Sequence, residues 1–256
     1  MSTVRVAIAG AGGRMGGALL EAAHTTEGVA LGAALDVKPG ARGDVAIATD
    51  VERALAGCDV LIDFTRPEGT LAHVAACREA RRAIVIGTTG FSAEQLATIR
   101  EAAREIPVVL APNMSVGVNV MLKLVELAAK ALGPDYDIDV FEMHHKLKVD
   151  APSGTALKLG EVAAAARSTT LERYGVYERH GHTGERKAGS IGFAVARGGD
   201  VVGDHTVYFA GTGERIEITH RSNSRATYAQ GAMRAAKFVA GRAPGLYGME
   251  DVLGLK

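Results

Sequence analysis

The chain has 256 residues, of which 47% are hydrophobic and 23% are charged, and its 29 basic side chains balance its 29 acidic ones. This length allows one large domain or two modest ones, and the balanced charge argues against a protein that binds nucleic acid or a membrane surface. Aromatic residues make up only 5% and Trp is absent, which argues against a surface for stacking nucleic-acid bases.

The first half of the chain alternates short apolar runs with helix-like runs. Strands are predicted at residues 4–9, 29–35, 60–64, 83–87 and 108–111, and helices within residues 10–26, 67–80 and 92–106. Strands that are apolar on both faces and alternate with helices form a parallel sheet covered on both sides. Residues 1–113 are therefore predicted to form a Rossmann-like, doubly wound α/β domain that binds a dinucleotide.

A different pattern follows residue 113. It predicts a helix at 116–132, a strand at 136–145, a helix near 153–167, three strands within 190–222 and a helix within 224–241. Residues 168–189 are polar and contain glycines, which predicts a long loop or lid. Adjacent strands indicate an α+β substrate domain with an open antiparallel or mixed sheet over residues 114–224. The last helix is expected to return to the first domain, which then comprises residues 1–113 with 225–256.

The cysteines and the opening residues indicate a reducing compartment. Cys58 and Cys77 lie in apolar or alanine-rich surroundings, so they are expected to be buried thiols and not a disulfide framework. The opening run MSTVRVAIAGAGG lacks the charged leader of a secretory signal, and no apolar run approaches the ~20 residues of a membrane span. We expect a cytoplasmic protein with no membrane partner.

A glycine-rich loop joins the first strand to the first helix. Gly10 allows a tight turn there, and Gly16 lets the helix pack closely on the strand. The strict GxGxxG spacing is not met, because Met15 takes the place of the third glycine. The helix N-terminus carries a partial positive charge and exposes N–H groups, with Gly12 and Gly13 approaching a pyrophosphate. The expected cofactor contacts of this loop are Gly10, Ala11, Gly12, Gly13, Arg14 and Met15.

Asp36 ends the second predicted strand, where a carboxylate can accept hydrogen bonds from the ribose hydroxyls of an adenosine. A 2′-phosphate would be repelled there, although Arg14, Lys38 and Arg42 are nearby cations. The cofactor is therefore expected to be NADH or NADPH, with NADH at least as good.

Two further segments follow strands at the same edge of the predicted sheet, where this architecture places its ligands. The first is GTTG after the fourth strand, and the second is APNMSVG after the fifth. Taken alone, both segments are also consistent with ordinary strand-to-helix turns. The expected cofactor contacts in these segments are Gly87, Thr88, Thr89, Ala111, Pro112, Asn113 and Met114.

The run HHKLKVDAPSGTAL at residues 144–157 gathers two histidines and two lysines directly before a helix. Lys146 and Lys148 are expected on one side of an extended segment. Ser153 is a candidate cap for the helix that follows. The N–H groups of Gly154 and Thr155 then lie in the first turn, without partners in their own helix. Cations and helix N–H groups together favour a carboxylate or phosphate ligand.

This cluster has two other interpretations. A histidine pair at a strand end can bind zinc, but the third ligand is not obvious, with His180 and His182 the candidates. A solvated basic patch is the second alternative. We expect an anion site and no metal.

The whole chain resembles the bacterial dihydrodipicolinate (4-hydroxy-tetrahydrodipicolinate) reductase family of diaminopimelate and lysine biosynthesis. The matching runs are VAIAGAGGRMG, GTTG, APNMSVGVN, HHKLKVDAPSGTA, IGFAVARGGDVVGDHTV and ITHRSNSR, which are spread from end to end. Two departures are Met114, where an aromatic residue is expected, and Leu147, where some members are polar. Neither departure removes a functional group. Val37 stands directly after Asp36, where some members have an arginine that binds a 2′-phosphate.

The resemblance implies roles for residues in the cationic run. It implies that His144 donates and accepts a proton, that Lys148 donates a proton and that His145 contacts the substrate. It also implies that Gly154 and Thr155 bind a substrate carboxylate, and it makes Arg225 a further substrate or hinge residue. The implied substrate is a small cyclic imine dicarboxylate.

The resemblance also implies a homotetramer whose interface is the sheet of the second domain.

The residues alone leave two alternative functions open. One is another nicotinamide-dependent dehydrogenase of a small carboxylic acid, and the other is a non-catalytic dinucleotide sensor. The sensor would keep the glycine loop but has no need of His144 and Lys148.

Overall fold

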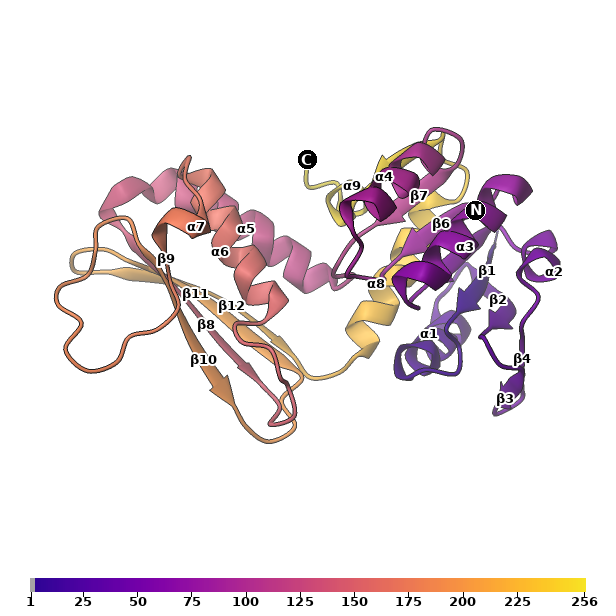
Figure 1. The fold of residues 1–256 in the computed structure, drawn as a ribbon, viewed down its shortest axis with the longest axis horizontal. Coiled ribbons are helices and arrows are strands. Elements are labelled where there is room, and N and C mark those ends of the chain that lie inside the picture. Colours follow the sequence, from indigo (N-terminus) through magenta and orange to yellow (C-terminus); the bar gives the residue numbers. More distant parts are fainter. Residues whose placement is uncertain (1–2) are drawn as a thin grey trace. The chain divides into compact units, whose positions relative to one another are not determined.

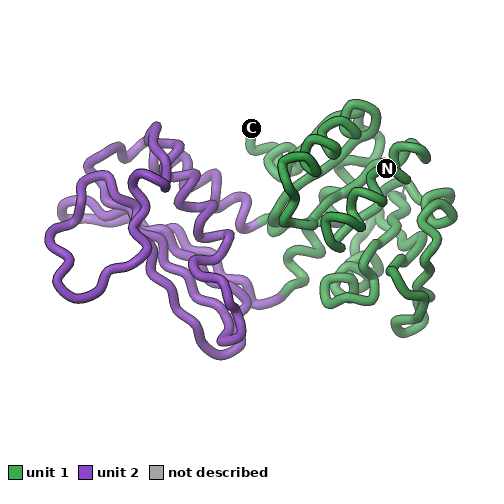
Figure 2. The backbone as a smooth tube through the Cα atoms, in the orientation of Figure 1, with its two compact units in different colours: residues 1–116, 225–256 green, residues 117–224 purple. Residues whose placement is uncertain are grey.

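The structure, a computed structural model, describes residues 3–256, and the chain divides into two compact units (Figure 2). Unit 1 comprises Met1–Val116 and Arg225–Lys256, and unit 2 comprises Gly117–Ser224. The sequence places these boundaries after residue 113 and before residue 225.

Unit 1 is built on a predominantly parallel sheet of eight strands. The order across the sheet is β13-β7-β6-β5-β1-β2-β4-β3, and only the edge strand β3 pairs antiparallel, with β4. The strands are β1 (Val4–Ala9), β2 (Val29–Leu35), β3 (Gly40–Arg42), β4 (Val45–Ala48), β5 (Val60–Asp63), β6 (Ala83–Ile86), β7 (Pro107–Leu110) and β13 (Gly245–Tyr247). The predicted Rossmann-like fold is confirmed.

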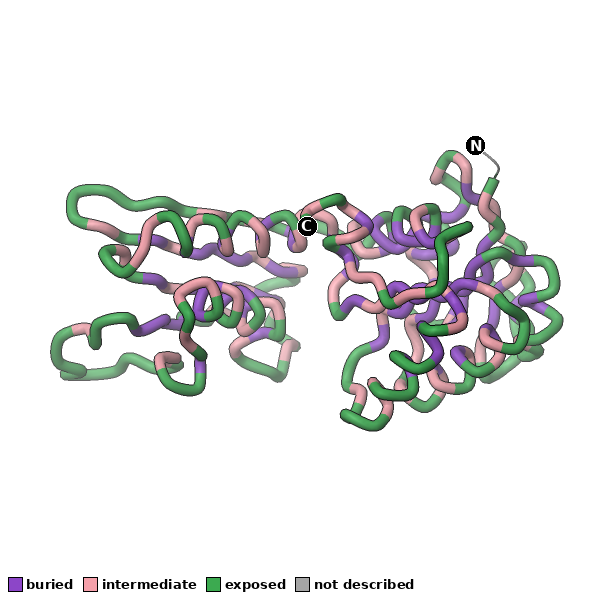
Figure 3. Tube along the Cα trace, turned by 90° about the horizontal axis from the view of Figure 1, so that it is seen from above, coloured by how far each residue is buried: buried purple, intermediate pink, exposed green. Residues whose placement is uncertain are grey.

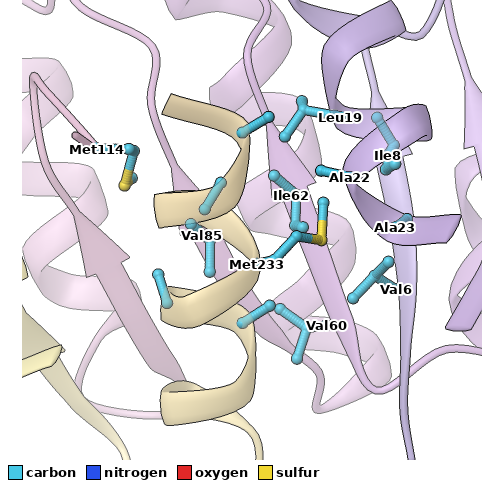
Figure 4. Packing of buried hydrophobic residues seen from close by; sticks show 14 of the residues in the cluster. Val6, Ile8, Leu19, Ala22, Ala23, Val60, Ile62, Val85, Met114 and Met233 are labelled. Atoms are coloured by element: carbon cyan, nitrogen blue, oxygen red, sulfur yellow. The ribbon is translucent and has the colours of Figure 1, made fainter. Parts of the chain in front are cut away.

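Helices cover both faces of this sheet. Side chains alternate along β1, so that Val6 and Ile8 face one helix layer while Ala7 and Ala9 face the other. The first layer contains α1 (Arg14–Thr25), α8 (Ala226–Val239) and α9 (Met249–Leu253), and the second contains α2 (Val51–Ala56), α3 (Pro67–Ala80) and α4 (Ala93–Ala102). Figure 4 shows α8 in the first layer, with Met233 among the side chains of the sheet.

Several local signals in unit 1 act as the sequence indicates. Pro67 occupies the first turn of α3, and Ser92 caps α4 in a capping box with Gln95. The sequence prediction assigns nothing between Asp36 and the third strand, where the structure forms β3, β4 and α2. It also treats residues 246–255 as a tail, whereas the structure forms β13 and α9 around them.

Unit 2 contains a mixed sheet of five strands in the order β12-β11-β8-β10-β9. Strand β10 is parallel to β8, while β11 is antiparallel to both β8 and β12, so the expected mixed sheet is confirmed. Strands β10 and β11 are consecutive in the chain but have β8 between them. The strands are β8 (Asp137–His144), β9 (Gly175–Val176), β10 (Ile191–Arg197), β11 (Gly203–Ala210) and β12 (Arg215–Ser222).

Two helices, α5 (Val116–Leu132) and α6 (Gly154–Ala166), cover one face of this sheet (Figure 1). Figure 3 shows that the buried segments of unit 2 run along its strands and the inward sides of these helices. The expected long loop at 168–189 is partly structured, since α7 (Leu171–Tyr174) and β9 lie in its first part. No helix within residues 3–256 is both long and apolar enough to cross a membrane.

Candidate active site

The glycine loop of unit 1 has the geometry that its sequence predicts. Gly10 adopts φ +80°, which favours glycine, and a Cβ built there would lie 2.9 Å from the carbonyl oxygen of Phe64. A Cβ on Gly16 would overlap the carbonyl oxygen of Gly10. The two glycines therefore permit the tight turn and the close approach of α1 to β1.

Asp36 lies against this loop at the end of β2. Its Oδ2 accepts a hydrogen bond from the Gly12 N–H at 2.9 Å, and its Oδ1 accepts one from the Val37 N–H at 2.7 Å. Gly13 donates its N–H to the carbonyl of Gly10 at 3.1 Å. The amides of Gly12 and Gly13 thus have acceptors within the chain. Helix α1 begins at Arg14, and the N–H groups of a first turn lack acceptors within their own helix.

Arg42, the last residue of β3, contacts the glycine loop, and the sequence prediction missed this structural role. Its Nη1 donates to the carbonyl oxygens of Ala11, Gly12 and Gly13 at 3.3, 3.2 and 2.9 Å. The guanidinium also occupies the space where a side chain on Gly17 would stand. Arg42 therefore fixes the carbonyl groups of the loop. The N–H groups of the loop point away from the Arg42 guanidinium.

A cavity of about 1080 Å³ lies beside the glycine loop within unit 1. Its lining includes Gly10, Gly12, Gly13 and Asp36, which the sequence predicts as cofactor contacts. Ligand pockets commonly have volumes of this order. The cavity, the close approach at Gly16 and the carboxylate of Asp36 together fit a dinucleotide.

The same cavity is lined by His73, which the sequence prediction overlooked. Its Nδ1 lies 2.5 Å from Oδ2 of Asp63, a carboxylate that is fully buried at the end of β5. The Oδ1 atom accepts from the backbone N–H of Thr65 and from the hydroxyls of Thr65, Thr70 and Thr88 at 2.8–3.0 Å. An acid at a strand end, followed by threonines and a histidine at helical spacing, is the signal that could have indicated this network.

The pKa of Asp63 is lower than its usual value near 3.8. Burial alone raises it, but the hydrogen bonds and charge of His73 and the hydrogen bonds from Thr65 outweigh that effect. Asp63 is therefore ionised at neutral pH, and it holds the imidazole of His73 in one orientation.

The segments after β6 and β7 lie at the same edge of the sheet but do not line this cavity. The hydroxyl of Thr88 is hydrogen-bonded to Asp63, whereas Thr89 is exposed. The ring of Phe64 occupies the space that a side chain on Gly87 would need. The Met114 side chain is buried in the core of unit 1 (Figure 4).

In unit 2, His144 is the last residue of β8 and is buried. Its Nδ1 lies 2.6 Å from Oε2 of Glu142, two residues earlier on the same face of the strand. The carboxylate of Glu142 also pairs with Arg197 from the adjacent strand β10, at 2.8 and 2.9 Å. Burial raises the pKa of Glu142, but hydrogen bonds from Arg197, His144 and Ser153 more than offset this, so the pKa lies below its usual value.

A second histidine, His205 on β11, lies edge-to-face with His144, with ring centroids 5.1 Å apart. Its Nε2 shares a hydrogen bond of 3.0 Å with the hydroxyl of Ser153. Burial, followed by the charge of His144, lowers the pKa of His205 to about 4. His205 is therefore neutral at neutral pH.

The residues after His144 form a turn and not the expected extended segment. Lys148 donates its backbone N–H to the carbonyl of His145 at 3.1 Å, and Lys146 is exposed within the turn. The Lys148 ammonium is 2.8 Å from Oδ1 of Asp150. His145 Nδ1 is buried without a hydrogen-bond partner among the described residues. A tight turn here brings the lysine back towards the end of β8.

Helix α6 begins as the sequence predicts. Ser153 is its N-cap, with its hydroxyl accepting the Ala156 N–H at 3.2 Å, and Gly154 and Thr155 are the first helical residues. Apart from its chain neighbours and the backbone of its own helix, no atom of residues 3–256 lies within 4 Å of the position that a Cβ on Gly154 would take. The positive end of the helix dipole is therefore accessible at a glycine. Arg225 is the exposed N-cap residue of α8 in unit 1.

Comparison with known proteins decides the family. A model described as the N-terminus of dihydrodipicolinate reductase matches residues 4–114, and one for the C-terminus matches residues 117–253. The chain belongs to the dihydrodipicolinate reductase family. This membership confirms the resemblance seen in the sequence motifs and makes the chain a reductase.

Relatives and solved structures extend the match over the full length. Proteins named 4-hydroxy-tetrahydrodipicolinate reductase from Cupriavidus necator and Nitrosospira multiformis are 58% and 56% identical, covering 99% and 100% of this chain and 100% of their own. A dipicolinate-bound dihydrodipicolinate reductase from Paenisporosarcina sp. TG-14 has a TM-score of 0.81 at 28% identity, covering 98% of this chain and 99% of its own. GenD2, solved with NAD, matches at TM-score 0.61 and 16% identity, which shows the fold alone. The N-terminal domain of this reductase family and the glycine loop described above fit a nicotinamide dinucleotide as cofactor.

Proposed function

We propose that the chain reduces 4-hydroxy-tetrahydrodipicolinate, by way of dihydrodipicolinate, to tetrahydrodipicolinate in diaminopimelate and lysine biosynthesis. The observation that carries this proposal is the cluster in unit 2, where a carboxylate-bonded His144, the turn bearing Lys148 and the open start of α6 at Gly154 belong to one local arrangement. The names of the full-length relatives support the same reaction.

The chemistry of the cluster suits this substrate. Loss of water from the 4-hydroxy compound gives dihydrodipicolinate. A bound nicotinamide dinucleotide would supply the hydride that reduces it, and the chain must supply a proton and hold two carboxylates. The start of α6 offers helix N–H groups and a positive dipole end to one carboxylate, at Gly154 and Thr155. His144 is a proton donor of suitable type near neutral pH, and Lys148 can donate a proton or stabilise developing negative charge. His145 is a further substrate contact, and Arg225 is a further substrate or hinge residue.

For the cofactor, we propose that NADH is used at least as well as NADPH. The glycine loop from Gly10 to Met15 holds the pyrophosphate, with the amides of the first turn of α1 facing it. Asp36 accepts hydrogen bonds from the adenosine ribose and repels a 2′-phosphate. Residues 87–89 and 111–114 contact the nicotinamide half, from the same edge of the sheet. We further propose that unit 2 binds the substrate and forms the interface of a homotetramer in the cytoplasm.

An assay of NADH oxidation with freshly prepared cyclic imine tests the reaction. We expect turnover by the wild type and a loss on the order of 10²–10⁴ in kcat for His144→Gln and for Lys148→Ala. The Kd of NADH should be nearly unchanged, because both residues belong to unit 2.

Other outcomes of this assay point to other proteins. NADH binding without turnover would favour a dinucleotide sensor. Turnover of a different small carboxylic acid, and none of the cyclic imine, would favour another dehydrogenase. Near-normal kcat in both variants would remove the assignments of His144 and Lys148.

A further inference from the structure

The carboxylate of Glu142 uses all of its acceptor positions inside unit 2. It is completely buried, and its Oε2 is 2.6 Å from His144 Nδ1 while its Oε1 accepts the Ser153 N–H at 3.0 Å. Arg197 donates Nη1 to Oε2 at 2.8 Å and Nη2 to Oε1 at 2.9 Å. A carboxylate offers about four lone-pair sites, so Glu142 has none left for a substrate. Glu142 can therefore affect the reaction only through the groups that it binds, which are His144, Ser153 and Arg197.

Arg197 is what allows this carboxylate to stay charged in a buried position. A bidentate guanidinium compensates the charge and fixes the plane of the carboxylate. Arg197 is itself held by the carbonyl oxygens of Ala196 and Asp150, both at 2.7 Å from it. The arginine thus ties the loop that carries Lys148 to the strand that carries His144.

An ionised carboxylate can only accept hydrogen bonds, and this determines the state of His144. The proton between Oε2 and Nδ1 must therefore belong to the imidazole, which leaves Nε2 to exchange protons. The space beside Nε2 is kept open by Gly203, where a Cβ would lie 3.0 Å from that nitrogen. Glu142 on β8 contacts the imidazole, His205 on β11 lies edge-to-face with it, and Arg197 on β10 shares the Glu142 carboxylate.

We infer that Glu142 is a positioning residue, which holds His144 as its Nδ1–H form with Nε2 presented for proton transfer. Through Oε1, the same carboxylate fixes the Ser153 N–H at the start of α6. One buried group therefore sets the relative placement of the proton donor and of the helix end proposed to bind the substrate carboxylate. The catalytic consequence of this inference rests on the proposed function, whereas its structural content does not.

The substitution Glu142→Gln reverses the hydrogen-bond pattern at His144. The amide oxygen is drawn to the Oε1 position, because the Ser153 backbone N–H can only donate, whereas His144 can change its tautomer. The amide NH₂ then points at His144 Nδ1, and the hydrogen bond from Arg197 Nη1 to that position is lost. Nδ1 must then accept, the neutral ring carries its proton on Nε2, and a doubly protonated ring is disfavoured. We expect kcat to fall by on the order of 10², with the KM of NADH unchanged and the alkaline fall of kcat displaced to lower pH.

The direct readout is the tautomer of His144, measured by ¹⁵N–¹H NMR of the histidine side chains and assigned with His144→Gln. The neutral wild-type ring should show Nδ1 protonated and Nε2 bare, and Glu142→Gln should invert this. A wild-type His144 with its proton on Nε2 would overturn the inference, whether or not any variant folds. This measurement needs no turnover, so it separates failure of the inference from failure of the proposed reaction.

Matched variants separate positioning from a general loss of structure. Glu126→Gln removes another ion-paired carboxylate of unit 2, which contacts Lys123 and Lys130, and should leave kcat and the tautomer unchanged. Gly203→Ala leaves Glu142 intact but crowds Nε2, so kcat should fall while the Nδ1–H form persists. Wild-type kcat in a folded Glu142→Gln, with an unchanged pH profile, would contradict the role of Glu142.

Discussion

His73 and Asp63 form an imidazole–carboxylate pair in unit 1, 2.5 Å apart, in which the carboxylate is fully buried and the imidazole lines the cavity beside the glycine loop. Four hydroxyl or amide donors hold the second carboxylate oxygen, so the imidazole is fixed in orientation. This places an oriented polar side chain in the cavity that fits the cofactor.

The substitution His73→Asn is expected to weaken NADH binding by about tenfold, because a hydrogen bond to a charged group contributes about 1.5 kcal/mol. Fluorescence titration of NADH measures this Kd. His24→Asn is the control, since His24 is exposed in the last turn of α1. An unchanged Kd in His73→Asn would show that His73 does not contact the cofactor.

Asp63 should make the stability of the protein depend on pH in the acid range. Its folded-state pKa is lowered from 3.8, so the unfolded chain binds the proton more readily. The stabilisation is complete above the unfolded value and is lost as the pH falls through the lower folded value. Asp63→Asn should lower Tm at pH 7 and reduce the further drop below pH 4. Thermal unfolding across this range measures both effects, and a variant with the wild-type acid profile would contradict the assignment.

His205 should give a second pH dependence, at higher pH. Its pKa is lowered from 6.5 to about 4, so between these values the unfolded chain binds more protons and stability rises with pH. The contribution of His205 to the free energy of unfolding is fully present above about pH 6.5. It is lost as the pH falls towards 4, by up to about 3 kcal/mol. The facing groups His144, Glu142, His220 and Lys148 contribute to this environment.

In His205→Gln, the difference in Tm between pH 7 and pH 5 should be smaller than in the wild type. The side-chain amide of the glutamine can retain the hydrogen bond with Ser153, so the comparison isolates the effect of His205 protonation. An equal difference in both proteins would place the pH dependence elsewhere.

Asp36 should control the choice between NADH and NADPH. Removing its charge by Asp36→Ser removes the repulsion of a 2′-phosphate, and Lys38 and Arg42 remain nearby. The ratio of kcat/KM for NADH to that for NADPH should fall by at least about tenfold. Steady-state assays with both cofactors measure this ratio. A strong NADPH preference in the wild type would contradict the role given to Asp36.

The sheet of unit 1 could be predicted because its signals are local. The strands at residues 60–63 and 83–86 are apolar on both faces, and Gly10, Gly16 and Asp36 occupy fixed places in the loop and strand that follow from backbone geometry. The short strands β3 and β4 were missed because GARGDVAIA mixes turn residues with a single brief apolar run. Only pairing with the edge of the sheet makes these residues strands.

The partners of the candidate catalytic residues could not be predicted, because they depend on register. Arg197 reaches Glu142 only because β10 runs parallel to β8, with Arg197 opposite His144. Arg197 and Glu142 are more than 50 positions apart in the sequence, and the sequence of neither strand indicates which strand it pairs with. The turn at Lys146–Leu147 was missed for a similar reason, since a basic run is equally compatible with an extended chain.

A crystal structure with NADH and pyridine-2,6-dicarboxylate, a planar analogue of the product, tests the central claim most directly. We predict one carboxylate on the N–H groups of Gly154 and Thr155, with Nε2 of His144 and the ammonium of Lys148 directed at the ring. The pyrophosphate should lie on the first turn of α1. A dicarboxylate bound away from residues 144–155, or the imidazole of His144 turned away from it, would contradict the account.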